Sequence, residues 1–168
     1  MHPDMDSPTL ATLTGLIAAP GQPDALLTRM ARMLMADPGY AMLTILLYDV
    51  AGGRGRRIYS TDEVAYPTGA FKPIPMTDWA DQVLVRHQPF IADTVADFRP
   101  HYGDWAKLEA MGLISGLNTP IIVDGVAIGS VNFTARSEGY YTPARVEAAR
   151  RCGALAAIAL LLEARGAA

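Results

Sequence analysis

The stretch SGLNTPIIVDGVAIGSVNF, from Ser115 to Phe133, constrains the fold more strongly than any other part of the sequence. Two apolar runs flank Asp124-Gly125, and an Asp-Gly pair is typical of a type I′ turn because both residues take a positive φ there. The stretch therefore predicts two antiparallel strands joined by a tight hairpin. Polar side chains interrupt the apolar runs at Ser115, Asn118, Thr119, Ser130 and Asn132. They face either water or something that the protein binds.

Counting outward from this turn gives the register of the hairpin, and so the face on which each side chain lies. Val123 opposes Val126 across a two-residue turn, and each further step outward pairs the next two residues. Since strand side chains alternate between the two faces, four more pairs share that face: Ile121 with Ile128, Thr119 with Ser130, Leu117 with Asn132, and Ser115 with Thr134. Asn118 is expected on the opposite face. A one-residue bulge near Gly129 would exchange the two faces.

The polar side chains on this face are expected to have hydrogen-bond partners. An unpaired buried amide costs about 1–3 kcal/mol. A patch beneath a covering segment is therefore expected to meet water, another side chain or a ligand. A face open to solvent is the alternative.

The rest of the chain divides into helices and strands by hydrophobic period and capping signals. Helices are expected over 7–20, 23–37, 77–87, 104–111 and 142–164. Strands are expected over 40–50, 57–60 and 89–93, and an irregular segment over 61–76. The loop over 51–57 contains Arg54, Arg56 and Arg57 among glycines, which indicates an exposed hairpin tip. Hairpin-linked strands flanked by helices indicate an α+β fold with an antiparallel sheet.

Composition restricts the class of protein. The chain has 168 residues, 51% of them apolar and 18% charged, and no internal repeat, which predicts one folded domain over 1–168. A net charge of −3 gives no sign of a nucleic-acid partner. The N-terminus lacks a secretory pattern, and the apolar stretch 153–162 is shorter than the roughly 20 residues that span a bilayer. A cytoplasmic protein without membrane contact is expected.

The ordered set of motifs resembles the GAF domain, a small-molecule sensor module. The hairpin is similar to that family's Ser-x-Leu-x-x-Pro, turn and Ile-Gly pattern through Ser115, Leu117, Pro120, Ile128 and Gly129. GYYTPARVEAARRCGALAAIAL resembles the family's terminal helix through Tyr141, Thr142 and Val146. LTILLYDV resembles its first strand, and QPFIADTVAD resembles the element that enters the ligand loop with Asp93.

The resemblance covers about residues 8–164 and implies a sheet of about six antiparallel strands. Terminal helices would pack on one face, while short helices and loops would close a ligand pocket on the other. The cyclic-nucleotide signature Asn-Lys-x-Asp-Glu is absent, since residues 132–136 read NFTAR. Bilin-binding members and free methionine sulfoxide reductases use pocket cysteines, whereas the sole cysteine here, Cys152, falls on the terminal helix. No cofactor and no metal are expected.

Catalytic residues are not evident in the sequence. Nucleophilic catalysis needs a nucleophile beside a base, and His2, His87 and His101 have no such partner in the pattern. His101 falls in the expected ligand loop, where it is placed to touch a ligand. An enzyme with an unrecognised site remains an alternative.

The expected pocket residues come from the aromatic-rich segment and from the hairpin. Eight of the thirteen aromatic residues fall between Tyr59 and Trp105, and small-molecule pockets are mostly apolar and aromatic with a few placed polar groups. The predicted ligand-binding residues are Tyr59, Tyr66, Phe71, Trp79, Asp93, Phe98, Tyr102, Trp105, Ser115, Thr119, Ser130, Asn132 and Thr134. Trp79, Phe90 and Trp105 have the alternative of anchoring short helices to the core. Lys72 and Arg99 are placed to pair with an acidic ligand.

The functional hypothesis is a sensory or regulatory domain. It would bind a small polar or heteroaromatic metabolite between the hairpin and the lid over 61–111. It would form a homodimer through the N- and C-terminal helices, since the last helix is broadly apolar. Asn132→Leu is expected to abolish binding and to leave the fold intact. A ligand-free dimerisation scaffold is the alternative.

Overall fold

The computed structural model describes residues 15, 17–36 and 39–166, and most of the helix expected over 7–20 lies outside them. The elements in chain order are α2 Asp24–Leu34, β1 Tyr40–Asp49, β2 Arg54–Ser60, β3 Lys72–Pro73, α3 Asp78–Ala80, the π-helix η1 Asp81–Val85, β4 Phe90–Ala92, α4 Val95–Phe98, α5 Trp105–Ala110, β5 Ser115–Val123, β6 Val126–Ala135 and α6 Pro143–Gly166. All six strands form one antiparallel sheet in the order β3-β2-β1-β6-β5-β4. The predicted α+β fold is confirmed.

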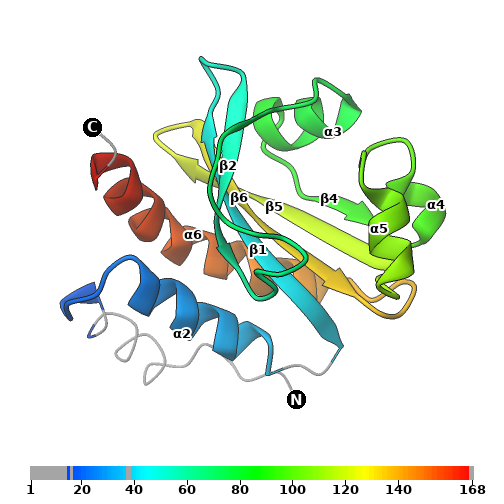
Figure 1. Ribbon diagram of the computed structural model, residues 1–168, viewed down its shortest axis with the longest axis horizontal. Coiled ribbons are helices and arrows are strands. Elements are labelled where there is room, and N and C mark those ends of the chain that lie inside the picture. The colour runs from blue at the N-terminus through cyan, green and yellow to red at the C-terminus, as the bar shows by residue number, and fades with distance from the viewer. Residues whose placement is uncertain (1–14, 16, 37–38, 167–168) are drawn as a thin grey trace.

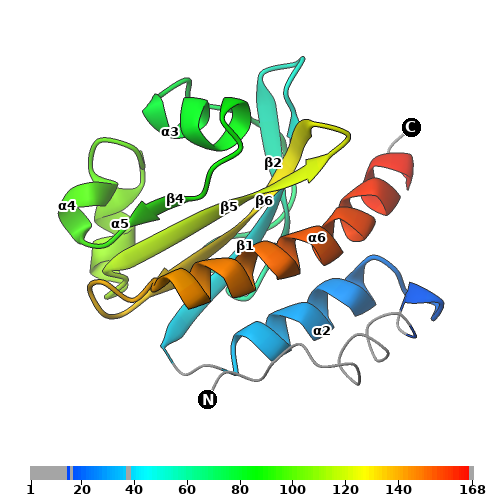
Figure 2. The same cartoon turned by 180° about the vertical axis from the view of Figure 1, so that it is seen from behind.

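The sheet separates two layers of different character (Figure 1). Helices α2 and α6 lie against one face, and the view from behind shows α6 running along β5 and β6 (Figure 2). The short helices α3, α4 and α5, with the loop after β2, lie over the other face. We call these the helix face and the lid face, and each has its own apolar core.

Strand β1 is buried on both faces, as its continuous apolar run predicts. Leu43, Ile45 and Leu47 pack into the core of the helix face, whereas Met42 and Tyr48 pack into the core of the lid face. Strand side chains alternate, so a central strand between two layers needs apolar residues at nearly every position. The apolar run therefore positions Tyr48 beneath the lid.

Helix α6 begins where its capping sequence predicts. The Thr142 hydroxyl accepts a hydrogen bond from the Arg145 backbone N–H at 3.4 Å, and Pro143 occupies the first helical position, where its missing N–H is harmless. Among the described residues, no helix combines the length and apolar character needed to cross a membrane.

Strand β2 is longer than predicted and begins at Arg54. A tight turn in which Gly53 takes φ 62° lets the strand start within the arginine cluster. Arg56 then points to the helix face, where its Nη2 lies 2.6 Å from a carboxylate oxygen of Glu163 on α6. The arginine cluster is therefore not simply a solvated tip, because Arg56 joins the sheet to the terminal helix.

Candidate ligand site

The hairpin contains the bulge that exchanges its faces. Val123 opposes Val126 as predicted, but Ile122 opposes Ala127 while Ile121 opposes Gly129. Ile128 is thus an extra residue on β6. Beyond it the predicted pairs are wrong by one position.

The corrected register regroups the polar side chains. Thr119 opposes Val131 in place of Ser130, and Asn118 opposes Asn132. The pairs predicted for Leu117 and Ser115 are likewise replaced: Leu117 opposes Phe133, Ser115 opposes Ala135, and Thr134 opposes Gly116. Ser130, Asn132 and Thr134 therefore share the lid face with Asn118, while Ser115 and Thr119 lie on the helix face.

The polar groups on the lid face bind one another in a chain of hydrogen bonds. The Tyr48 and Ser130 hydroxyl oxygens lie 2.6 Å apart, and the Ser130 hydroxyl donates to Asn132 Oδ1 at 2.8 Å. Asn118 Nδ2 donates to the same Oδ1 at 2.7 Å. Asn132 Nδ2 donates in turn to the Thr44 hydroxyl at 3.4 Å. We call this set, with the two lid residues described next, the amide network.

Two lid side chains complete the amide network. Trp79 Nε1 donates to Asn118 Oδ1 at 2.7 Å, and the Tyr102 hydroxyl donates to the same oxygen. An indole N–H can only donate, so it fixes which end of the Asn118 amide faces the lid. The Asn118 NH₂ group then faces Asn132. Burial raises the pKa of the Tyr102 phenol well above its usual range, which keeps it a donor.

The space that the sequence assigns to a ligand above Asn132 is therefore occupied by the lid's own side chains. Phe98 is fully buried, with its ring over Gly116, and its centroid lies 5.2 Å from that of Tyr102. The amide network is consequently part of the packing between sheet and lid.

The remaining predicted pocket residues are dispersed. Tyr59 packs with the core of the helix face, on the other side of the sheet from the lid. Phe71 is 39% exposed, with the Arg54 guanidinium 4.6 Å from its ring centroid. Asp93 is exposed. Trp105 is half-buried and lies under Arg99.

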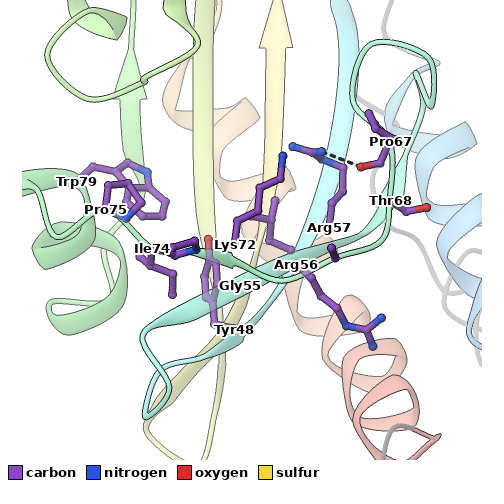
Figure 3. A pocket seen from close by; sticks show the side chains of 13 residues that line it. Tyr48, Gly55, Arg56, Arg57, Pro67, Thr68, Lys72, Ile74, Pro75 and Trp79 are labelled. Atoms are coloured by element: carbon purple, nitrogen blue, oxygen red, sulfur yellow. Dashed lines mark hydrogen bonds between the residues drawn. The ribbon is translucent and has the colours of Figure 1, made fainter.

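A groove of about 330 Å³ opens beside the amide network, between the lid face of β1 and β2 and the loop that follows β2 (Figure 3). It is lined by Leu46, Tyr48, Gly55, Arg56, Arg57, Pro67, Thr68, Ala70, Lys72, Pro73, Ile74, Pro75 and Trp79. Of the thirteen predicted ligand-binding residues it includes Trp79 alone, and it also includes Lys72, which the sequence places to pair with an acidic ligand. Tyr48 and Trp79 belong to both the groove and the amide network.

Sequence reasoning assigned Tyr48 and Arg57 no role in binding. Tyr48 lies within an apolar run, and its hydroxyl was the only sign that it reaches a polar partner. Arg57 was assigned to the loop tip. Its place opposite Leu46 in the β1–β2 ladder puts it on the lid face with Tyr48. Among the described residues, no group of three or more acidic, histidine or cysteine side chains is placed to hold a metal ion.

An antiparallel six-stranded sheet, with terminal helices on one face and a lid of short helices and loops on the other, defines a GAF-type α+β domain. A family model described as GAF domain matches residues 22–161. The chain belongs to the GAF domain family. GAF domains are in general small-molecule sensory or regulatory modules.

Solved structures share this fold at low sequence identity. The GAF domain of a phosphoenolpyruvate-protein phosphotransferase from Coxiella burnetii aligns with a TM-score of 0.72 at 20% identity, over 95% of both chains. The GAF domain of a sensor histidine kinase from Bacillus halodurans aligns with 0.69 at 15% identity, over 86% of this chain and 98% of that one. A free methionine-R-sulfoxide reductase from Neisseria meningitidis aligns with 0.67 at 13% identity, over 94% and 89%. No curated protein sequence matches the chain significantly.

Proposed function

We propose that this GAF domain is a homodimeric sensor that binds a small molecule in the groove beside the amide network. The observation that carries the proposal is the groove itself, whose walls combine apolar side chains with a few polar ones: Tyr48, Arg57, Thr68, Lys72 and Trp79. Its volume of about 330 Å³ falls in the range of small-molecule sites.

The contacts of Trp79 support a sensory role. Its ring lines the groove, while its Nε1–H donates to Asn118 on β5. The centroids of the Tyr48 and Trp79 rings lie 6.5 Å apart with the rings nearly perpendicular. A ligand that displaces either ring must alter the amide network, which joins the lid to β1, β5 and β6.

We do not extend the activity of the reductase neighbours to this chain. Its single cysteine, Cys152, lies on α6 and packs in the core of the helix face. The groove lies on the lid face. Burial raises the pKa of the Cys152 thiol to about 11, so the nucleophilic thiolate is scarce at neutral pH.

Filling the groove is expected to abolish ligand binding. Ala70 lines the groove and is exposed, so Ala70→Trp places an indole in it without disturbing a core. Native mass spectrometry is first used to find a ligand that co-purifies with the protein or binds from a metabolite panel. Thermal shift then measures the stabilisation by that ligand, which Ala70→Trp should remove.

The matched control is Ala110→Trp, since Ala110 is an exposed alanine of α5 that does not line the groove. It should retain the full thermal shift. If no compound in the panel binds the native protein, the sensor proposal fails in favour of a ligand-free scaffold. If Ala70→Trp binds as tightly as the native protein, the ligand site is elsewhere.

Charges on the C-terminal half of α6 are expected to dissociate the dimer. Leu161 is 46% exposed and Leu162 36% exposed, next to the side chains with which α6 packs on the sheet. A double substitution to glutamate should shift the sedimentation coefficient from dimer to monomer. Val64→Glu is the control, because Val64 is 97% exposed and lies in the lid loop. A native protein that sediments as a monomer at micromolar concentration would refute this part of the proposal.

A further inference from the structure

The groove has a one-sided charge. Lys72 on β3 opposes Gly55 on β2, and Arg57 lies two residues beyond Gly55, so Lys72 and Arg57 share the lid face. Figure 3 shows both side chains extending in the same direction from neighbouring strands, whereas the Arg56 guanidinium points away toward α6. Among the described residues, no aspartate or glutamate lines the groove.

Arg57 is only partly compensated in this position. Its Nη1 donates to the Pro67 carbonyl at 2.9 Å, and its guanidinium lies 5.0 Å from the centroid of the Tyr66 ring. Its Nε is buried and has no hydrogen-bond acceptor in the described part of the chain. A buried donor without an acceptor costs about 1–3 kcal/mol, and more for a charged group. An acceptor brought by a ligand would relieve this cost.

The electrostatics of Arg57 agree with this geometry. Burial lowers the pKa of its guanidinium, and that effect outweighs the attraction of Tyr66, Asp104 and Glu63. The Glu63 carboxylate accepts hydrogen bonds from the Thr68 backbone N–H and hydroxyl, at 2.9 and 3.3 Å. In the part of the chain that the structure describes, no ion pair joins a carboxylate to Arg57 or to Lys72.

The other end of the groove is apolar. Ile74, Pro75 and the Trp79 ring line it. A flat hydrophobic body fits such a surface, because aromatic faces and prolines favour stacking contacts. The groove thus has a cationic end and an apolar end.

We propose that the ligand of this groove is a small aromatic or heteroaromatic carboxylate, with its carboxylate between Arg57 and Lys72 and its ring against Ile74 and Trp79. The proposal rests on the function proposed above and names the chemical class of its ligand. The arginine fork matches the two oxygens of a carboxylate, and the Lys72 ammonium adds a second positive charge at the same end of the groove.

The test compares acids with their uncharged amides. Indole-3-acetate and benzoate are titrated against indole-3-acetamide and benzamide by calorimetry and by ¹⁵N chemical-shift mapping of the full chain. At least one acid should bind at least ten-fold more tightly than its amide and shift the amide resonances of β2, β3 and the Trp79 region. A tenfold higher salt concentration should weaken the binding of the acid ligand and leave the binding of the amide ligand unchanged.

Variants locate the charge that recognises the acid. Lys72→Met and Arg57→Met should each lower the affinity for the acid about ten-fold or more. Lys72→Arg should retain most of the affinity of the native protein. Arg86→Met is the matched control, since Arg86 is 53% exposed, pairs with Asp81 and does not line the groove. If Arg57→Met fails to fold, Lys72→Met still decides, because Lys72 is exposed.

The outcomes separate this proposal from the one on which it rests. If the amides bind as tightly as the acids, or if Lys72→Met leaves the affinity for the acids unchanged, the ligand is not a carboxylate. The groove would then bind a neutral ligand. A phenyl phosphate that binds more tightly than benzoate overturns the carboxylate in favour of a phosphate ester. If neither these probes nor any compound of the metabolite panel binds, the groove itself is not a ligand site, and both proposals fail.

Discussion

Gly129→Ala is expected to lower the free energy of unfolding by about 3 kcal/mol, because no room exists for a methyl group at this position. A Cβ on Gly129 would lie 2.2 Å from Leu160 Cδ2 on α6 and 2.2 Å from the Leu46 backbone oxygen on β1. The leucine side chain can rotate, but the carbonyl belongs to the β1–β6 ladder and cannot move without disturbing the sheet. Urea denaturation followed by circular dichroism measures the loss, and the melting temperature should fall by roughly 6–12 °C.

Gly153→Ala is the matched control on α6. The nearest atoms to a Cβ there are 3.8 Å away, in ordinary van der Waals contact. Alanine is favoured over glycine in a helix interior by about 0.8–1 kcal/mol, so this variant should be slightly more stable than the native protein. A Gly129→Ala variant as stable as the native chain would show that α6 does not pack on β6 as described.

The elements that local signals define were predictable. The Asp124-Gly125 turn, the start of α6 at Pro143 and the doubly buried β1 agree with the sequence. Turn chemistry, capping and hydrophobic period each depend on a few neighbouring residues. The short α4 and β3 were not predicted, since neither contains enough residues to show a period.

The face of the sheet on which each hairpin side chain lies could not be predicted from the sequence, for a physical reason. Away from its tip the hairpin is buried on both faces, and each face carries both polar and apolar residues, so alternation gives no sign of the bulge at Ile128. A single extra residue changes which side chains share a face. Its effect on function is large, because it brings Asn118 to Asn132 and moves Thr119 to the opposite core.

The aromatic residues of the lid show the same limit. Composition indicates that this segment covers the sheet, but it does not tell which rings fill the space and which line an opening. Phe98 and Tyr102 fill it, while Trp79 both packs and lines the groove. That distinction depends on long-range contacts to β5 and β6, which no local pattern encodes.

The corrected register also changes how Asn132 is best used. Its amide binds Asn118, Ser130 and Thr44 within the protein. Asn132→Leu would therefore break internal hydrogen bonds, and a loss of ligand binding would follow from damage to the fold. Substitutions at Lys72 and Ala70 are the cleaner probes of binding.

Asn118→Leu is expected to destabilise the protein by about 3 kcal/mol or more. The substitution removes the acceptor of the Trp79 indole N–H, leaves the Tyr102 hydroxyl without Asn118 Oδ1, and deprives Asn132 of a donor. Each buried polar group left unpaired costs about 1–3 kcal/mol. Chemical denaturation measures the loss. Since Trp79 is one of two tryptophans, the native fluorescence spectrum should change as well.

Thr119→Val is the matched control on the same strand, one residue away and on the other face. Thr119 is 1% exposed, and its hydroxyl has no hydrogen-bond partner in the described part of the chain. Valine keeps the shape and removes an unpaired polar group, so the free energy of unfolding should stay the same or rise by up to about 1 kcal/mol. The original sequence-based register makes the reverse prediction, with Thr119 on the lid face and Asn118 beneath the helices. A Thr119→Val variant that loses more stability than Asn118→Leu would therefore restore that register and remove the amide network.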